Sequence, residues 1–145
     1  MNPLIDKSLA LKWNSNDEIY SANEKSILTV EYNYGLAINF YEYNNTENKI
    51  TLAERATYDA GIKLDKVITA YNKYYVVTAK NTLKQQYETF IYSTQGKLIL
   101  KDDAAIYKLD DDKKMLIKYL VGANYTELYL TYLDENLKPY SIIKD

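Results

Sequence analysis

The chain has 145 residues, a formal net charge of −2, and neither cysteine nor histidine. The two absences exclude disulfides, thiolate zinc sites, thiol nucleophiles and acid–base catalysis by histidine. The chain has 47% hydrophobic and 26% charged residues, and 17 residues are tyrosine. This composition is that of a folded domain, so we expect one β-rich domain over residues 1–145.

The first predicted element is a short N-terminal helix over residues 3–12. Asn2 is a good N-cap and Pro3 suits the first helical position. Charged residues interrupt the apolar residues up to Trp13, so this segment lacks the apolar core of a signal peptide. Since no later apolar run is long enough for a membrane helix, we expect a cytoplasmic protein with no membrane partner.

From Ile19 onward, apolar and polar residues alternate with a period of two, which is typical of half-buried strands. The alternation is clearest in residues 27–32, 36–43 and 115–121, and Lys118 is expected to point outward from the last of these. Short polar turns separate the strands and predict hairpins. The fold is therefore predicted to be mainly β, an antiparallel meander with one face in solvent. The turns are residues 23–25, 44–48, 95–96, 110–112 and 134–136.

Residues 51–60 depart from the alternation. Thr51 and Glu54 have the spacing of a capping box, the residues that follow favour helix, and Gly61 is suited to end it. One or two helical turns are predicted here, between strands.

A weak internal repeat accompanies the strand pattern. The segment Asp59–Leu64 is echoed by Asp103–Leu109, and each copy is followed by a pair of strands. The chain is therefore interpreted as three degenerate units over residues 19–58, 59–102 and 103–145.

The segment Tyr92–Lys101, with the residues up to Ile106 that follow it, resembles the WG-type β-repeat of bacterial proteins and, more loosely, a propeller blade. The resemblance covers residues 59–145, which lack the Trp-Gly pair of that repeat, and it implies binding of proteins or small ligands. Three blades are too few for a closed propeller. The alternatives are a sandwich, an irregular barrel, or propeller-like blades that close a ring in a two-fold dimer. Open sheet ends invite strand pairing, which favours the sandwich or barrel.

A group of aspartates is the first candidate site: Asp102, Asp103, Asp110, Asp111 and Asp112. The simplest interpretation is two acidic turns that flank a strand. The alternatives are a negative patch for a basic protein and a Ca²⁺ or Mg²⁺ site. Because the segment lacks the central glycine and final glutamate of an EF-hand loop, no metal and no cofactor is predicted.

The tyrosines are the second candidate. Tyr41 and Tyr43 lie on the strand face opposite Phe40, and exposed tyrosines suit a binding surface. The alternative is that tyrosine replaces phenylalanine in the core. Tyr74 and Tyr75 are adjacent, so we expect only one of them to be buried.

The leading functional hypothesis is a small acidic protein-binding domain, most concretely an immunity or inhibitor protein that neutralises a toxin, for example a basic nuclease. The five aspartates, with Tyr41 and Tyr43, are its predicted partner-binding residues, and the chain is expected to be a monomer or a two-fold homodimer. Nucleic acid is not expected as a partner, because the chain is acidic. The alternative is a module that binds a small ligand or carbohydrate in a tyrosine-lined site. No catalytic residue is predicted, although a pair of carboxylates acting as in glycosidases stays an alternative.

Overall fold

The computed structural model describes residues 18–32, 35–110, 112, 115–121 and 128–140. In these residues it contains eleven strands and no helix, so the prediction of a mainly β antiparallel fold is confirmed. The helix predicted at 3–12 lies outside the described residues, and no described helix is long and apolar enough to span a membrane. The strands are β1 (Glu18–Tyr20), β2 (Ser26–Glu31), β3 (Ala37–Asn44), β4 (Lys49–Thr57), β5 (Ile62–Ala70), β6 (Tyr74–Asn81), β7 (Gln86–Ser93), β8 (Leu98–Asp103), β9 (Ile106–Leu109), β10 (Leu116–Val121) and β11 (Leu128–Leu133).

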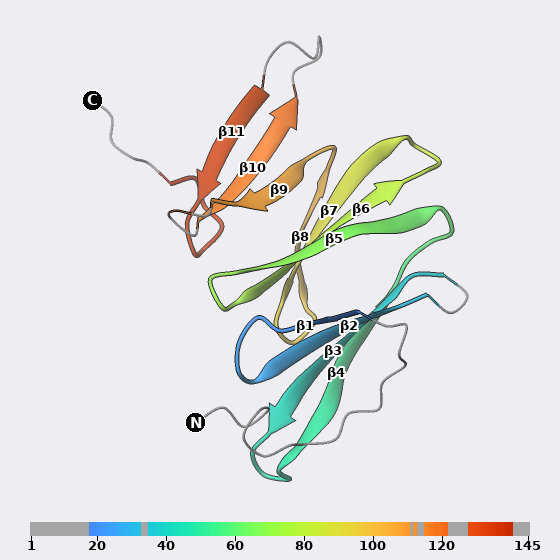
Figure 1. The fold of residues 1–145 in the computed structure, drawn as a ribbon, viewed down its shortest axis with the longest axis vertical. Coiled ribbons are helices and arrows are strands. Elements are labelled where there is room, and N and C mark those ends of the chain that lie inside the picture. Colours follow the sequence, from blue (N-terminus) through green and yellow to red (C-terminus); the bar gives the residue numbers. More distant parts are fainter. Residues whose placement is uncertain (1–17, 33–34, 111, 113–114, 122–127, 141–145) are drawn as a thin grey trace.

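Strands that follow one another in the chain pair antiparallel and form three sheets: β1–β4, β5–β8 and β9–β11. The central sheet, β5–β8, lies between the other two (Figure 1). The first strands of neighbouring sheets are in contact, β1 with β5 and β5 with β9. In the part of the chain that the structure describes, the sheets stack and do not close into a barrel.

Two apolar cores hold the stack together, one on each face of the central sheet. The first contains Leu28 and Phe40 from the first sheet and Val77 from the central sheet. The second contains Val76 from the central sheet and Leu116 from the third. Val76 and Val77 are adjacent and both fully buried, because alternate residues of β6 point into different cores.

Both faces of the central sheet are covered, contrary to the expectation that each sheet has one face in solvent. Tyr75 is fully buried in the first core and Tyr74 is 8% exposed in the second. The prediction that only one of the two is buried was wrong, because it assumed a single core. A strand covered on both faces needs apolar residues at consecutive positions, and β6 has them.

The predicted helix at 51–60 was also wrong. Residues Lys49–Thr57 form β4, which pairs with β3 over its whole length. A register shift opposite Phe40 and Tyr41 accommodates one extra residue, Ala53, in β4. Long-range pairing with β3 therefore overrides the local helix preference of this segment.

In the third sheet, the face of β10 that packs on the central sheet is the one opposite to that expected from the sequence. Leu116 and Leu133 pack on the central sheet, so Lys118 on the same face of β10 also points toward it. The prediction that Lys118 points outward was wrong. Ile117 and Tyr119 lie on the opposite face of β10, away from the central sheet.

Candidate functional site

Asp102 and Asp103, the first two aspartates of the acidic group, lie at the end of β8 and are already paired. The Asp102 carboxylate accepts a hydrogen bond from the Tyr107 hydroxyl at 2.8 Å and lies 2.7 Å from Lys118 Nζ. Asp103 is exposed and lies 3.4 Å from Lys101 Nζ. Asp102 therefore links the central sheet to the third sheet, and its contacts stabilise the fold.

Asp110 and Asp112 lie at the other end of β9, about 13 Å away along the strand at the usual rise per residue. Asp110 accepts hydrogen bonds from the Tyr132 hydroxyl at 3.2 Å and from the Asp112 backbone N–H at 2.9 Å. Asp111 lies outside the described residues. In the described part of the chain, no three acidic side chains are grouped so as to hold a metal ion. The described aspartates of the predicted acidic group thus lie in two separate places instead of on one surface.

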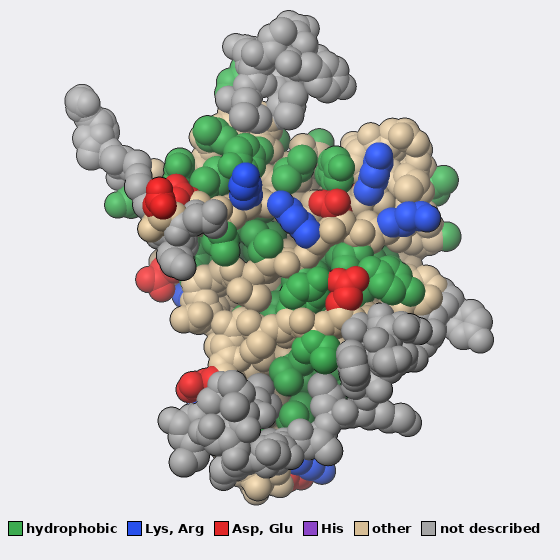
Figure 2. Space-filling model, viewed as in Figure 1, with side chains coloured by type: hydrophobic (Ala, Val, Ile, Leu, Met, Phe, Trp, Pro, Cys, Tyr) green, Lys and Arg blue, Asp and Glu red, His purple; other side chains and the backbone are tan. Residues whose placement is uncertain are grey.

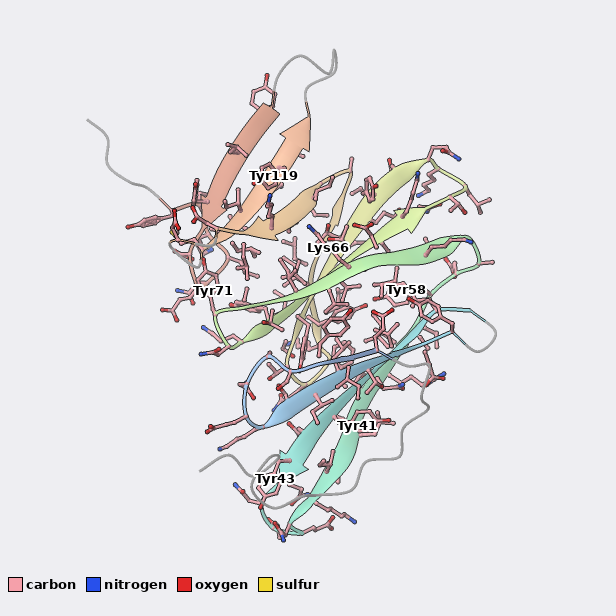
Figure 3. All side chains as sticks on the ribbon, in the orientation of Figure 1. Tyr41, Tyr43, Tyr58, Lys66, Tyr71 and Tyr119 are labelled. Atoms are coloured by element: carbon pink, nitrogen blue, oxygen red, sulfur yellow. The ribbon has the colours of Figure 1, made fainter. Side chains whose placement is uncertain are left out.

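Tyr41 and Tyr43 lie on β3, on the face of the first sheet that points away from the central sheet (Figure 3). Both are half-buried, and the Tyr43 hydroxyl donates to Asn48 Oδ1 at 2.6 Å. The central sheet separates this face from the aspartates of the third sheet. The structure does not bring the tyrosines and aspartates together.

A cleft between the first and central sheets is a better candidate for a binding site. It has a volume of about 490 Å³ and is bounded by residues 57–62, by the turn between β6 and β7, and by one face of β7 and β8. Volumes of this size are typical of pockets for small molecules. A larger hollow of about 700 Å³ beside residues 23–26 contains no buried charged side chain.

Glu88 is the unusual residue of this cleft. It lies on β7 and is 2% exposed, and alternation along the strand places it on the same face as Phe90 and Tyr92. Asn81 Nδ2 donates a hydrogen bond to Glu88 Oε2 at 3.2 Å. The Oε1 atom of Glu88 accepts no hydrogen bond from any described residue, although a buried carboxylate is unfavourable unless it is fully paired.

The turn between β6 and β7 determines how the Asn81 side chain is oriented. Asn81 Oδ1 accepts the backbone N–H groups of Leu83 at 3.1 Å and Lys84 at 3.0 Å. Because the amide oxygen is engaged in the turn, Nδ2 is directed toward Glu88. The turn thus holds a donor beside the carboxylate before any ligand arrives.

Aromatic side chains form the apolar wall. Tyr58 lies between the first and central sheets (Figure 3), and its ring meets Phe90 edge-on at a centroid distance of 5.0 Å. The Tyr58 and Tyr92 hydroxyls are hydrogen-bonded to each other. Burial raises the pKa of Tyr58 and of Tyr92 above the ordinary value for tyrosine, so both hydroxyls stay protonated at neutral pH.

The cleft is lined by charges of both signs, Lys84 and Lys101 together with Asp59 and Glu88. Lys84 forms no ion pair with any described residue, whereas Lys101 is paired with Asp103. Lys101 Nζ also lies 5.6 Å from the centre of the Phe90 ring. Charges of both signs around the cleft suit a ligand without net charge.

Sequence reasoning missed Tyr58, Glu88 and Tyr92. A signal for Glu88 was present, since it shares a strand face with Phe90 and Tyr92 in residues 87–92 and is the charged residue of that stretch. A charged residue on the apolar face of a strand is a candidate functional group. The partners at Tyr58 and Asn81 come from other elements and left no local pattern.

No family model, no curated protein and no solved structure matches this chain. The resemblance to the WG-type repeat over residues 59–145 therefore stays a prediction.

Proposed function

We propose that this protein is a binding module for a small neutral polyol, such as a carbohydrate, and that it binds this ligand in the cleft between the first and central sheets. The observation that carries the proposal is Glu88, a 2%-exposed carboxylate with one hydrogen bond from the described residues. Its second oxygen is suited to accept a ligand hydroxyl, and hydrogen bonds to a charged acceptor are strong.

The other walls support the same class of ligand. Rings and alkyl groups at Tyr58, Phe90 and Leu98 offer apolar surface to the C–H face of a sugar, and Leu98 is 47% exposed at the cleft. Charges of both signs around the cleft favour a neutral ligand over an anion or a cation.

The protein-binding hypothesis, with an immunity or inhibitor protein as its concrete form, stays a prediction. That hypothesis relied on one acidic surface, whereas the described aspartates of the predicted site lie in two separate groups. Asp102, in the first of these groups, is bound by Lys118 and Tyr107. The cleft is the stronger basis, because it contains a buried carboxylate with one hydrogen bond from the described residues.

The test is a Glu88→Gln substitution, which keeps the shape of the side chain and removes its charge. We expect binding of a responsive sugar, found by thermal-shift screening of neutral mono- and disaccharides, to weaken about 10- to 100-fold by calorimetry. The melting temperature of the free variant should stay equal or rise, because an underpaired buried charge is removed.

The control is Glu47→Gln, since Glu47 is exposed and its carboxylate lies 3.0 Å from Nζ of the exposed Lys49. It should change neither binding nor melting temperature. If Glu88→Gln lowers the melting temperature and leaves sugar binding intact, Glu88 is structural and the cleft is not the site. A screen in which no sugar shifts the melting temperature also contradicts the proposal.

A further inference from the structure

Asn81 and Glu88 form a hydrogen-bonded pair inside the cleft, and both side chains are almost completely buried. Asn81 is 9% exposed and Glu88 is 2% exposed. Glu88 on β7 lies opposite Ala79 on β6, two residues before Asn81, so the pair are diagonal neighbours on one face of the central sheet. Buried polar groups need partners for their donors and acceptors, so the hydrogen bonds of this pair indicate what the cleft can bind.

The pair has one unused donor and one unused acceptor. Asn81 Oδ1 accepts two backbone N–H groups of the β6–β7 turn, and Nδ2 donates one of its two hydrogens to Glu88 Oε2 at 3.2 Å. Within the residues that the structure describes, the second Nδ2 hydrogen and Glu88 Oε1 have no partner. A ligand that enters the cleft therefore meets a donor beside an acceptor.

The surrounding bonds prevent the Asn81 amide from exchanging these roles. If the amide turned over, its NH₂ group would face two N–H donors of the turn and its oxygen would face the carboxylate. The turn is also bonded to residues 57–62, because the Gly61 carbonyl oxygen accepts the Thr82 backbone N–H and the Thr82 hydroxyl, each at 2.8 Å. Donor and acceptor are thus preorganised, which favours one pattern of ligand groups over others.

The buried part of the cleft offers a ligand few other polar contacts. Figure 2 shows hydrophobic side chains at the junction of the first and central sheets, and Ile62 and Phe90 line the cleft there. The charged side chains of Asp59, Lys84 and Lys101 are exposed. The ligand hydroxyls that become buried are therefore recognised by Asn81 and Glu88.

The spacing of the unused groups suits two hydroxyls on neighbouring carbons. Both oxygens of the Glu88 carboxylate are bonded to one carbon, so Oε1 is next to the oxygen that Asn81 Nδ2 already binds at 3.2 Å. Hydroxyls on neighbouring ring carbons are also close to each other, and one can donate to Oε1 while the other accepts from Nδ2.

We propose that the cleft recognises a vicinal diol, with Glu88 binding one hydroxyl and Asn81 the other, so that Asn81 determines the specificity for the second hydroxyl. This inference rests on the proposed sugar-binding function and narrows its ligand class. A ligand that lacks either hydroxyl leaves a buried polar group of the pair unpaired, which is more costly than the loss of an exposed hydrogen bond.

The first test uses the unmodified chain. A thermal-shift panel contains the methyl glycosides of glucose, mannose and galactose, together with maltose, cellobiose and lactose. The sugar with the largest shift is then compared by calorimetry with each of its monodeoxy forms. We expect two forms, which lack hydroxyls on neighbouring carbons, to bind about 10- to 100-fold more weakly, and the other forms to bind within about threefold of the parent sugar.

The outcomes separate this inference from the proposed function. If Glu88→Gln weakens binding and the sugar depends on one hydroxyl alone, or on two hydroxyls of separated carbons, the diol inference is overturned and the proposed function stands. A panel in which no sugar binds contradicts the proposed function, and the diol inference with it.

The second test assigns the hydroxyls with the double variant Asn81→Asp, Glu88→Gln, which keeps the net charge. The new carboxylate at position 81 can still accept the turn N–H groups and one hydrogen from the new amide at position 88, whose oxygen then takes the place of Oε1. Only the donor at position 81 is lost. We expect the double variant to bind the parent sugar and one of the two sensitive deoxy forms equally, while the other deoxy form still binds more weakly.

The matched control is Asn45→Asp, Glu47→Gln, the same exchange at exposed positions in the β3–β4 turn, at the end of β4 far from Thr57. This control should discriminate against both deoxy forms as the unmodified chain does. Unchanged discrimination against both forms in the folded Asn81→Asp, Glu88→Gln variant overturns the role of Asn81. Circular dichroism checks the fold, and if this variant does not fold, the deoxy series on the unmodified chain still decides whether a vicinal diol is recognised.

Discussion

At the residue scale, Gly96 shows how closely the turn between β7 and β8 packs on the first sheet. Its φ is +91°, and a Cβ atom built on it would lie 2.6 Å from Glu54 Cβ and 2.7 Å from Phe40 Cδ1. Phe40 is fully buried, with Tyr75 and Tyr92 ring centroids at 6.0 and 4.9 Å, so its ring has no room to yield. Both the backbone conformation and the packing therefore require glycine.

Gly96→Ala should lower the free energy of unfolding by about 2–4 kcal/mol, the sum of backbone strain and overpacking. Gly35→Ala is the control, because Gly35 has a φ of +117° and no atom within 4 Å of the added Cβ position. It should lose about 1 kcal/mol from backbone strain alone. Urea unfolding measures both values, and equal losses would mean that the contact with Phe40 has no effect.

At the element scale, the β5–β6 hairpin holds the third sheet in place. Tyr71 and Asn72 both have a φ of 57°, and the tight turn that they form is closed by the Lys73 N–H, which donates to the Ala70 carbonyl oxygen at 3.1 Å. The Tyr71 hydroxyl donates to the Leu133 carbonyl oxygen and accepts the Leu116 N–H at 3.0 Å. Figure 3 shows Tyr71 beside the lower end of the third sheet. One turn of the central sheet thus bonds to β10 and β11 together.

Tyr71→Phe should lower the free energy of unfolding by about 1–2 kcal/mol, because it leaves the buried carbonyl group and N–H without this partner. Hydrogen exchange should speed up at the Leu116 amide and in β11 more than in the first sheet. Tyr119→Phe is the control, since Tyr119 lies in the same sheet and its hydroxyl makes no hydrogen bond with a described residue. Uniform acceleration across all three sheets would show that Tyr71 has no specific effect on docking.

At the scale of the whole molecule, buried tyrosines connect the three sheets and make the fold sensitive to alkali. Burial raises the pKa of Tyr58, Tyr75 and Tyr92 in the first core and of Tyr107 in the second. Burial and a hydrogen bond to Glu18 raise the pKa of Tyr20 to about 12. In the unfolded chain these hydroxyls ionise near pH 10. The folded state therefore retains protons that the unfolded state releases, so stability is complete below pH 10 and falls as the pH rises above it.

The melting temperature should accordingly stay nearly constant from about pH 7 to 9 and fall steeply above pH 10. Tyr20→Phe should lose less stability between about pH 10 and 12 than the unmodified chain, because one of the linked groups is gone. Thermal unfolding across this range, with tyrosinate absorbance as a second signal, measures the effect. Tyrosinate that forms at pH 10 in the folded protein would contradict the argument.

Much of the fold was predictable because its signals are local. Alternation in residues 27–32 and 36–43 placed Leu28, Val30, Ile38 and Phe40 on one face, and all four are fully buried. Polar turns such as 44–48 marked hairpins that the structure contains. Adjacent side chains on a strand point to opposite faces, so a period of two is visible without any tertiary contact.

The candidate site was less predictable, because its parts come from distant segments. The aspartates and Tyr41 were chosen for their residue types, and the structure distributes them over different sheets. Glu88, Asn81 and Tyr58 come together only when the turn between β6 and β7 and the segment 57–62 enclose one end of two sheets.

The sequence by itself determined that the described chain forms antiparallel strands, and it located most of the hairpins between them. Only the tertiary structure decided which faces are covered, namely both faces of β6 and the Lys118 face of β10. It also decided that β4 is a strand in place of a helix. The reason is physical. Alternation specifies two different faces of a strand, whereas the burial of each face depends on sheets formed by residues far away in the chain.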